Sequence, residues 1–210
     1  MNTRNSSQVG SRPTPAEAKA ALRNELLRNV RIIAAILAVL WLVGLVDWLA
    51  FGGRLETFGV VPRTSRGLLG ILFAPFLHTG FSHLLANTVA FLLFGGLVLF
   101  RQERDFWIVT GIGALFSGVG TWLVGHTGVH VGASGVIFAY FGYLLLTGWF
   151  ERRILSLILS LLVFLVWWRT LFGLMPNQQG ISWEGHLFGL FGGMLAARLL
   201  ARRGRVPGAA

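Results

Sequence analysis

Long apolar stretches separated by short polar turns run along most of the chain. A helix needs about 20 mostly apolar residues to cross a hydrocarbon core of roughly 30 Å. Six stretches approach that length, namely 31–52, 83–100, 105–125, 134–150, 153–173 and 184–201. The fourth and sixth stretches lie near the short end of the usual range. The pattern therefore predicts an all-α membrane protein that is a bundle of six transmembrane helices.

The remaining segments divide the chain into a membrane domain over 29–203 and two tails. Residues 1–28 form a polar tail that we expect to be partly disordered, with an amphipathic helix over Glu17–Arg28. Residues 204–210 form a short basic tail. The connection 53–82 contains the apolar run LLGILFAPFL, which is broken by Pro75 and is too short to span. This long loop is expected to lie in or near the membrane interface.

Composition agrees with a membrane protein and excludes several other classes. Hydrophobic residues make up 54% of the chain and charged residues only 12%, whereas soluble domains have about 25% charged residues. The chain has no cysteine, which excludes disulfides, thiolate chemistry and cysteine-ligated zinc. The net charge of +10 is spread between the apolar spans rather than gathered on one soluble face. We therefore expect a lipid bilayer, and no nucleic acid, as partner.

The basic residues also predict the orientation of the chain. Fourteen Arg and Lys residues flank one side of the predicted spans, against three or four on the other side. Because cytoplasmic loops carry the excess of positive charge, both termini are expected in the cytoplasm. That result requires an even number of spans, which six satisfies. The arginine-rich, cysteine-free composition suits a bacterial inner membrane.

Four unusual polar residues fall at one predicted depth of the bilayer. In this topology the second, fourth and sixth helices start at the outer face, and their first turns hold His83, Asn87, Ser134 and His186. Each residue has an ordinary explanation when it is taken alone: a serine among glycines can be a packing residue, and a histidine at a helix end can be a structural group. Polar groups within a bilayer are costly, so four at one level indicate a shared function.

Acyl transfer by an activated hydroxyl is the chemistry that uses these residue types. Ser134 would be the nucleophile and His186 the general base. The His83 ring, the Asn87 amide and the Ser134 backbone N–H could stabilise the oxyanion. Glu184 is the nearest acidic residue to His186 and lies off its helix face. We therefore predict a Ser–His dyad without a third acidic member.

Three motifs of the chain are spaced as in a known family of membrane proteases. They are His78, His83 and Asn87, then Gly132–Gly135 (GASG), then His186, Gly189 and Gly193. Over residues 30–201 the chain resembles the rhomboid family. The resemblance implies a rhomboid-like bundle of six transmembrane helices with a long membrane-associated loop between the first and second. It also implies a serine endopeptidase without cofactor that cleaves transmembrane-segment substrates near the outer membrane face.

The same resemblance assigns supporting roles and reveals two departures. His78 would be structural or would organise water, and the fifth helix with the following cap would form a substrate gate. Phe138 stands where many relatives have a tyrosine that stacks on the base. The acidic residue that commonly follows the paired glycines of the second helix is absent after Gly95–Gly96, and Glu103 is its possible replacement.

The sequence also suggests other functions and other sites besides a rhomboid-like protease. A rhomboid-like protein could bind transmembrane clients without cutting them. A small transporter is disfavoured, because the sequence has neither an internal repeat nor a pair of embedded carboxylates. His126 and His130 are spaced like metal ligands, but no carboxylate or cysteine is near them in the sequence, so we expect loop hydrogen bonds and no metal. Asp47 is expected to be hydrated at the interface. The natural substrate and the oligomeric state stay open.

Overall fold

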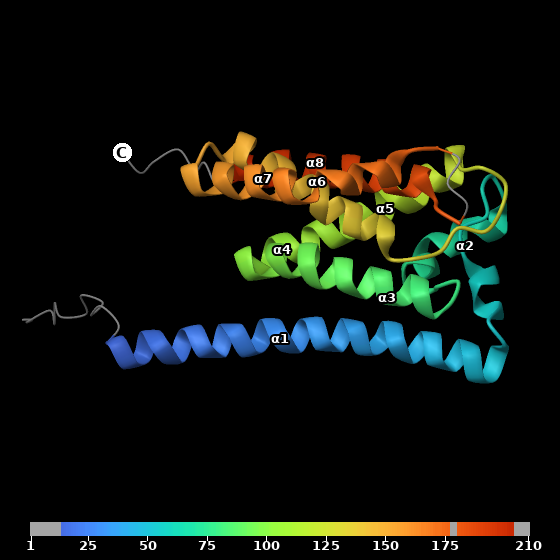
Figure 1. The fold of residues 1–210 in the computed structure, drawn as a ribbon, viewed down its shortest axis with the longest axis horizontal. Coiled ribbons are helices and arrows are strands. Elements are labelled where there is room, and N and C mark those ends of the chain that lie inside the picture. Colours follow the sequence, from blue (N-terminus) through green and yellow to red (C-terminus); the bar gives the residue numbers. More distant parts are fainter. Residues whose placement is uncertain (1–13, 177–179, 204–210) are drawn as a thin grey trace, which may run out of the picture.

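A computed structural model describes residues 14–176 and 180–203, and these residues are almost entirely helical. The long helices run side by side as one bundle, with α1 along one side of the others (Figure 1). Helices α3, α6 and α8 begin at the end of the bundle that holds α2, whereas α1 begins and α8 ends at the opposite end (Figure 1). We call these ends the α2 end and the opposite end.

The first helix is longer than the span predicted for it. Helix α1 (Pro15–Val46) continues as the π-helix η1 (Asp47–Phe51). It starts at a capping box in which the Thr14 side chain accepts from the Glu17 N–H and the Glu17 carboxylate accepts from the Thr14 N–H. The predicted helix over Glu17–Arg28 is therefore confirmed, but it is continuous with the first span. The predicted disorder of residues 1–13 and the basic tail 204–210 lie outside the described residues.

Four helical segments among the described residues are long and apolar enough to cross a membrane. They are α1 with η1; α3 (Phe81–Ala90), η4 (Phe91–Gly95) and α4 (Gly96–Arg101) together; α5 (Glu103–Val124); and α7 (Ile154–Trp167) with η5 (Trp168–Leu174). The chain is therefore an all-helical, multi-pass membrane protein, as its pattern predicted.

The fourth and sixth predicted spans are also helices, α6 (Ser134–Glu151) and α8 (Trp183–Arg203). They are not among the four segments with a membrane-spanning composition. The reason is their surroundings: twelve of the 18 residues of α6 are buried by other helices, and a helix enclosed by protein does not need a uniformly apolar surface. Length and composition alone therefore support four spans rather than six.

The connection between η1 and α3 consists of short helices and turns, and hydrogen bonds attach it to the loop between α5 and α6. It contains η2 (Arg54–Phe58), α2 (Ser65–Phe73) and η3 (Ala74–Phe76), none long enough to span. Val60 exchanges backbone hydrogen bonds of 2.9 Å with His130, and the Arg63 guanidinium donates to the Gly125 carbonyl at 3.0 Å. These bonds fix the loop to the α5–α6 connection.

Helices α6 and α8 meet through glycines. A Cβ added at Gly189 would clash with the Gly135 carbonyl, and one added at Gly193 would clash with the Ala139 carbonyl. The two backbones therefore lie in direct contact, as small-xxx-small stripes allow. This contact sets the relative position of the first turns of α6 and α8.

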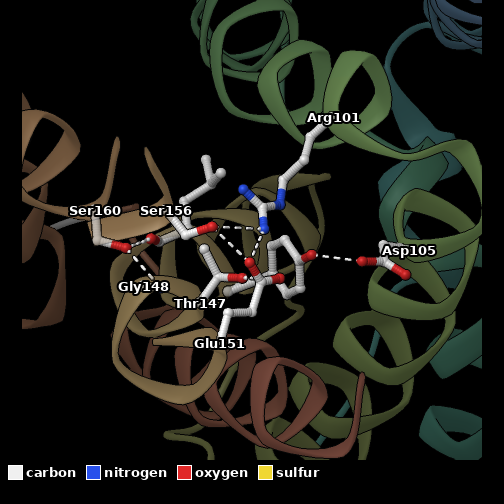
Figure 2. Close-up of polar contacts among 9 residues, drawn as sticks. Arg101, Asp105, Thr147, Gly148, Glu151, Ser156 and Ser160 are labelled. Carbon is white, nitrogen blue, oxygen red and sulfur yellow. Dashed lines mark hydrogen bonds and ion pairs between the residues drawn. The ribbon is translucent and has the colours of Figure 1, made fainter. Parts of the chain in front are cut away.

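A cluster of polar side chains joins the helices at the opposite end (Figure 2). Arg101 of α4 forms an ion pair with Glu151 of α6 and donates to the Ser156 hydroxyl of α7 at 3.2 Å. Tyr143 of α6 donates to the Asp105 carboxylate of α5 at 2.6 Å. Four helices thus share one hydrogen-bonded group.

Two acidic residues have roles that the sequence did not indicate. Glu103 forms an ion pair with Arg28 at 2.7 Å, so it ties α5 to α1. Asp47 is only 3% exposed, and its carboxylate accepts from the Leu55 N–H at 2.9 Å. The expectation that Asp47 is hydrated is wrong, because the chain folds back over it and supplies a hydrogen-bond donor.

Candidate active site

Ser134 begins α6 at the α2 end of the bundle. Gly132, two residues earlier, has a φ of 118°, which residues other than glycine rarely adopt. Its N–H donates to the Ala74 carbonyl at 2.8 Å. This turn brings the chain from the α5–α6 connection into α6 and leaves Ser134 half-buried. As the first helical residue, Ser134 has an N–H with no carbonyl partner inside the helix.

His186 of α8 lies against the serine. Its Nε2 is 2.8 Å from the Ser134 Oγ, and its Nδ1 is 2.9 Å from the backbone carbonyl of Gly173 in η5. A carbonyl can only accept, so Nδ1 carries the ring proton and Nε2 is left to accept from the serine hydroxyl. The Gly173 carbonyl thus orients the imidazole ring, which is the role that a carboxylate has in a catalytic triad. Sequence reasoning missed Gly173, because a backbone carbonyl leaves no residue signature.

Phe138 covers one face of the His186 ring. The two rings are stacked, with centroids 4.2 Å apart and planes inclined by 12°. Phe138 is one turn after Ser134 on α6 and is 6% exposed. The phenyl ring therefore restricts the imidazole to one plane, although it has no hydroxyl to donate or accept.

His83 and Asn87 of α3 face the backbone just before the serine. A Cβ on Gly132 would lie 2.8 Å from the His83 Nε2 and 3.3 Å from the Asn87 Nδ2. The Asn87 Nδ2 is buried, and no residue within 14–176 or 180–203 accepts a hydrogen bond from it. The His83 Nδ1 lies 3.0 Å from the Thr79 hydroxyl, a neighbour that sequence reasoning overlooked although it is four residues away. Two side-chain nitrogens therefore point toward the space beside Gly132.

His78 is close to this group but does not contact the serine. It is 5% exposed, its ring centroid is 5.1 Å from that of His83, and neither of its ring nitrogens has a hydrogen-bond partner among the described residues. Burial, with the His83 ring nearby, lowers the pKa of His78 to about 4. The ring is therefore neutral near pH 7.

The remaining motif glycines pack the helices behind the serine. Gly135 lies against Ser117 of α5 and the Gly185 carbonyl of α8, and Gly189 lies against Gly135 itself. A small cavity beside Ser134 is lined by residues of α5 and of the loops, including Ser117 and Ser182. Neither of these two serines was singled out from the sequence, because isolated serines carry no distinctive pattern.

His126 and His130 do have a carboxylate neighbour. Glu184 of α8 accepts from the His126 backbone N–H at 2.9 Å, and its Oε1 is also 2.9 Å from the His126 Nδ1. His130 makes the loop hydrogen bond that we expected, from Nε2 to the His126 carbonyl at 3.0 Å. The expectation that the pair has no carboxylate to complete a site is wrong, because the fold brings Glu184, 58 residues from His126 in the chain, beside it.

The fold and the geometry together define a class: a multi-pass helical membrane protein with a hydroxyl–imidazole pair enclosed between its helices. The family model "Rhomboid domain" matches residues 65–203. The chain is 31% identical over 188 residues to "Putative rhomboid protease YdcA" of Bacillus subtilis, which covers 83% of this chain and 89% of that protein. The protein therefore belongs to the rhomboid family.

Further relatives come from mycobacteria. The chain is 39% identical over 178 residues to "Uncharacterized protein Rv1337" of Mycobacterium tuberculosis, which covers 80% of this chain and 74% of that protein. It is 37% identical over 178 residues to "Uncharacterized protein ML1171" of Mycobacterium leprae. These names assign no activity.

Proposed function

We propose that this protein is an intramembrane serine endopeptidase that cleaves transmembrane segments through an acyl-enzyme, with Ser134 and His186 as a catalytic dyad. One observation carries the proposal: the 2.8 Å contact between the Ser134 Oγ and the His186 Nε2, in a ring whose Nδ1 proton is held by the Gly173 carbonyl. That tautomer is the one a general base requires.

The reaction proceeds in two halves. The Ser134 Oγ attacks the scissile carbonyl carbon while its proton passes to the His186 Nε2. The C–N bond then breaks, and the departing amine takes that proton, which leaves an ester on Ser134. Water next attacks the ester with His186 again as base, and the product acid leaves as the serine hydroxyl is restored. Phe138 keeps the ring in line through both halves by stacking on it.

Negative charge on the carbonyl oxygen would be met by three donors. They are the Asn87 Nδ2, the His83 Nε2 and the Ser134 N–H at the start of α6. The Thr79 hydroxyl donates to the His83 Nδ1 in this assignment, so Nε2 keeps its proton and can donate. The unpartnered amide of Asn87 supports this role, because a buried donor without an acceptor costs free energy that a transition-state oxygen would recover.

His78 would organise water or pack the loop rather than react, because it is buried beside His83 and away from the serine. Gly132, Gly135, Gly189 and Gly193 support the site by allowing the close approach of α3, α6 and α8. The proposed chemistry itself uses only groups of the protein and water, so it needs no cofactor.

The proposed topology has six transmembrane helices in the domain 29–203, with both termini in the cytoplasm of a bacterium and the site near the outer face of its inner membrane. Helices α6 and α8 would be enclosed spans, which accounts for their less apolar composition. The excess of basic residues beside the opposite end of the bundle supports that orientation. Membrane proteins are then the substrates, and the surrounding bilayer is the other partner.

Helix α7 with η5 is the proposed substrate gate. Side-chain hydrogen bonds join the first half of α7 to the end of α6 through Ser156 and Ser160. At its other end, η5 contacts the site through the Gly173 carbonyl. A substrate that displaced this end could reach Ser134 from the side while the inner half of α7 stays attached.

Substitution of the proposed nucleophile tests the function. Ser134→Ala is expected to abolish cleavage of a model transmembrane substrate in proteoliposomes and labelling by a fluorophosphonate, because it removes the hydroxyl that is paired with His186. Ser82→Ala, on the exposed first turn of α3, is the matched control and should retain both. Equal cleavage by wild type and Ser134→Ala would refute the dyad. A wild type that binds transmembrane segments but neither cuts them nor reacts would indicate a client-binding protein.

A further inference from the structure

We propose that His126, His130 and Glu184 form a binding site for one divalent metal ion of the zinc class. Each residue offers one ligand atom, and these three atoms lie within 4.8 Å of one another. Two imidazoles and a carboxylate are a common ligand set for Zn²⁺ with an open fourth position. Hard cations such as Mg²⁺ prefer all-oxygen ligands, so imidazole nitrogens select against them.

The side chains are already gathered by contacts that a metal could replace. The His126 and His130 ring centroids are 4.5 Å apart, and the His126 Nδ1 is 2.9 Å from the Glu184 Oε1. The His130 Nδ1 lies 2.8 Å from the Ser182 hydroxyl. Ligand atoms around a tetrahedral Zn²⁺ are about 3.4 Å apart, as follows from metal–ligand bonds of about 2.0–2.1 Å. Small rotations of the two rings would therefore bring all three ligands to bonding distance.

Glu184 supplies an independent indication that this group suits a cation. The residue is only 2% exposed, and its Oε2 is buried without a hydrogen-bond partner in the part of the chain that the structure describes. A buried carboxylate oxygen is costly unless it is paired or coordinates a metal. His126 donates to the Glu184 Oε1, but no described residue donates to Oε2, so the carboxylate keeps an unused acceptor beside two imidazoles.

An ion could enter from the aqueous surface at the α2 end. The His126 side chain is 55% exposed, whereas Glu184 lies beneath it. The exposed imidazole would capture the ion, and the buried carboxylate would hold it. Glu184 therefore supplies the negative charge of the site, and His126 is the ligand that an ion can reach from solvent.

A bound ion would join two segments that carry the proposed catalytic residues without touching either residue. His130 is four residues before Ser134, and Glu184 is two residues before His186. The ion would thus clamp the α5–α6 connection to the first turn of α8. Metal binding at this place does not depend on the proposed protease activity.

Metal binding to the purified protein tests the proposal. The tag-free full chain in detergent is stripped with EDTA and then supplied with ZnCl₂. We expect one Zn²⁺ per chain and a rise of about 5 °C in the unfolding temperature, because the ion binds the folded state. MgCl₂ should give neither effect. Co²⁺ should give the visible absorption of a tetrahedral site that includes imidazole nitrogen.

Three variants locate the ion. His126→Ala removes an exposed ligand, and Glu184→Gln keeps the acceptor for the His126 N–H while removing the charge. Both should weaken Zn²⁺ binding more than about tenfold and should lose the thermal shift. Thr127→Ala, on the exposed loop between the ligands, should bind as the wild type does.

Two outcomes would overturn the proposal. One is a wild type that takes up no Zn²⁺ and shows no thermal shift. The other is a His126→Ala variant that binds as tightly as the wild type, which would place the ion elsewhere, for example on His83 and His186. A Ser134→Ala protein that still binds Zn²⁺ would show that the ion and the catalytic serine are independent.

Discussion

Asn87 has a buried donor near Ser134 that no acceptor of the described residues satisfies. Its Nδ2 is buried, has no acceptor, and faces Gly132 beside His83. A donor in this state stabilises little in the resting protein, but it would gain a full hydrogen bond to an oxygen that becomes negative in the transition state. The residue is therefore expected to affect the rate of reaction more than substrate binding.

Replacing Asn87 separates these two effects. Asn87→Ala is expected to lower kcat by about 10²–10³ with KM nearly unchanged, because an oxyanion donor acts mainly in the transition state. Asn87→Asp has the same shape with no donor and should be similarly impaired. Ser82→Ala is again the control. Steady-state cleavage of a fluorogenic transmembrane substrate gives both constants, and a loss confined to KM would contradict the assignment.

Single residues differ in how far the sequence predicts their neighbours. Ser134, His186, His83 and Asn87 could be expected at one level, because alternating helix directions put their first turns at the same end of the bundle. The pairing of His186 with Gly173 and of His126 with Glu184 could not be expected. The first uses a backbone carbonyl, and the second joins residues that no helix period or motif relates.

At the scale of elements, α6 and α8 form the frame of the candidate site. Their glycines at Gly135, Gly189 and Gly193 bring the two backbones into contact over about two turns. The extra burial makes α6 a core helix, which is why its apolar signal is weaker than that of α7. The sequence pattern located both helices, yet it could not tell an enclosed helix from one that faces lipid, because packing partners are not encoded locally.

A methyl group added at this contact should lower the free energy of unfolding more than a methyl group added elsewhere on the helices. Gly189→Ala is expected to destabilise the protein by about 1–3 kcal/mol, because the added Cβ meets the Gly135 backbone. Gly111→Ala on α5 is the matched control, since its Cβ would meet no atom within 4 Å. It should be neutral or stabilising by up to about 1 kcal/mol. Unfolding in mixed micelles measures both, and equal destabilisation would contradict the packing argument.

At the scale of the whole molecule, the two ends of the bundle are held differently. Loops, the Val60–His130 bridge and the candidate site occupy the α2 end. The opposite end is closed by the polar cluster around Arg101 and Glu151 (Figure 2). Since these two groups are far apart along the helices, stability and chemistry should be separable by mutation.

Arg101→Ala tests that separation. Loss of the guanidinium leaves the partly buried Glu151 without its cation, and we expect a loss of about 1–3 kcal/mol in unfolding free energy. Arg104→Ala, at an exposed position of α5 three residues further along the chain, should change it by less than about 0.5 kcal/mol. The kcat of the folded Arg101→Ala protein should equal that of the wild type. Equal unfolding free energies of the two variants would show that the polar cluster does not stabilise the fold.

The nature of the atoms opposite each glycine also limits how the sequence can diverge. At Gly118 a new methyl group would come closest to the end of the Ile71 side chain, so a smaller residue at position 71 could restore the space. At Gly189 and Gly193 it would meet only main-chain carbonyls, which every amino acid possesses. A second substitution at Gly135 or Ala139 cannot remove these main-chain atoms. We therefore expect both positions of the α6–α8 contact to remain glycine as the sequence evolves.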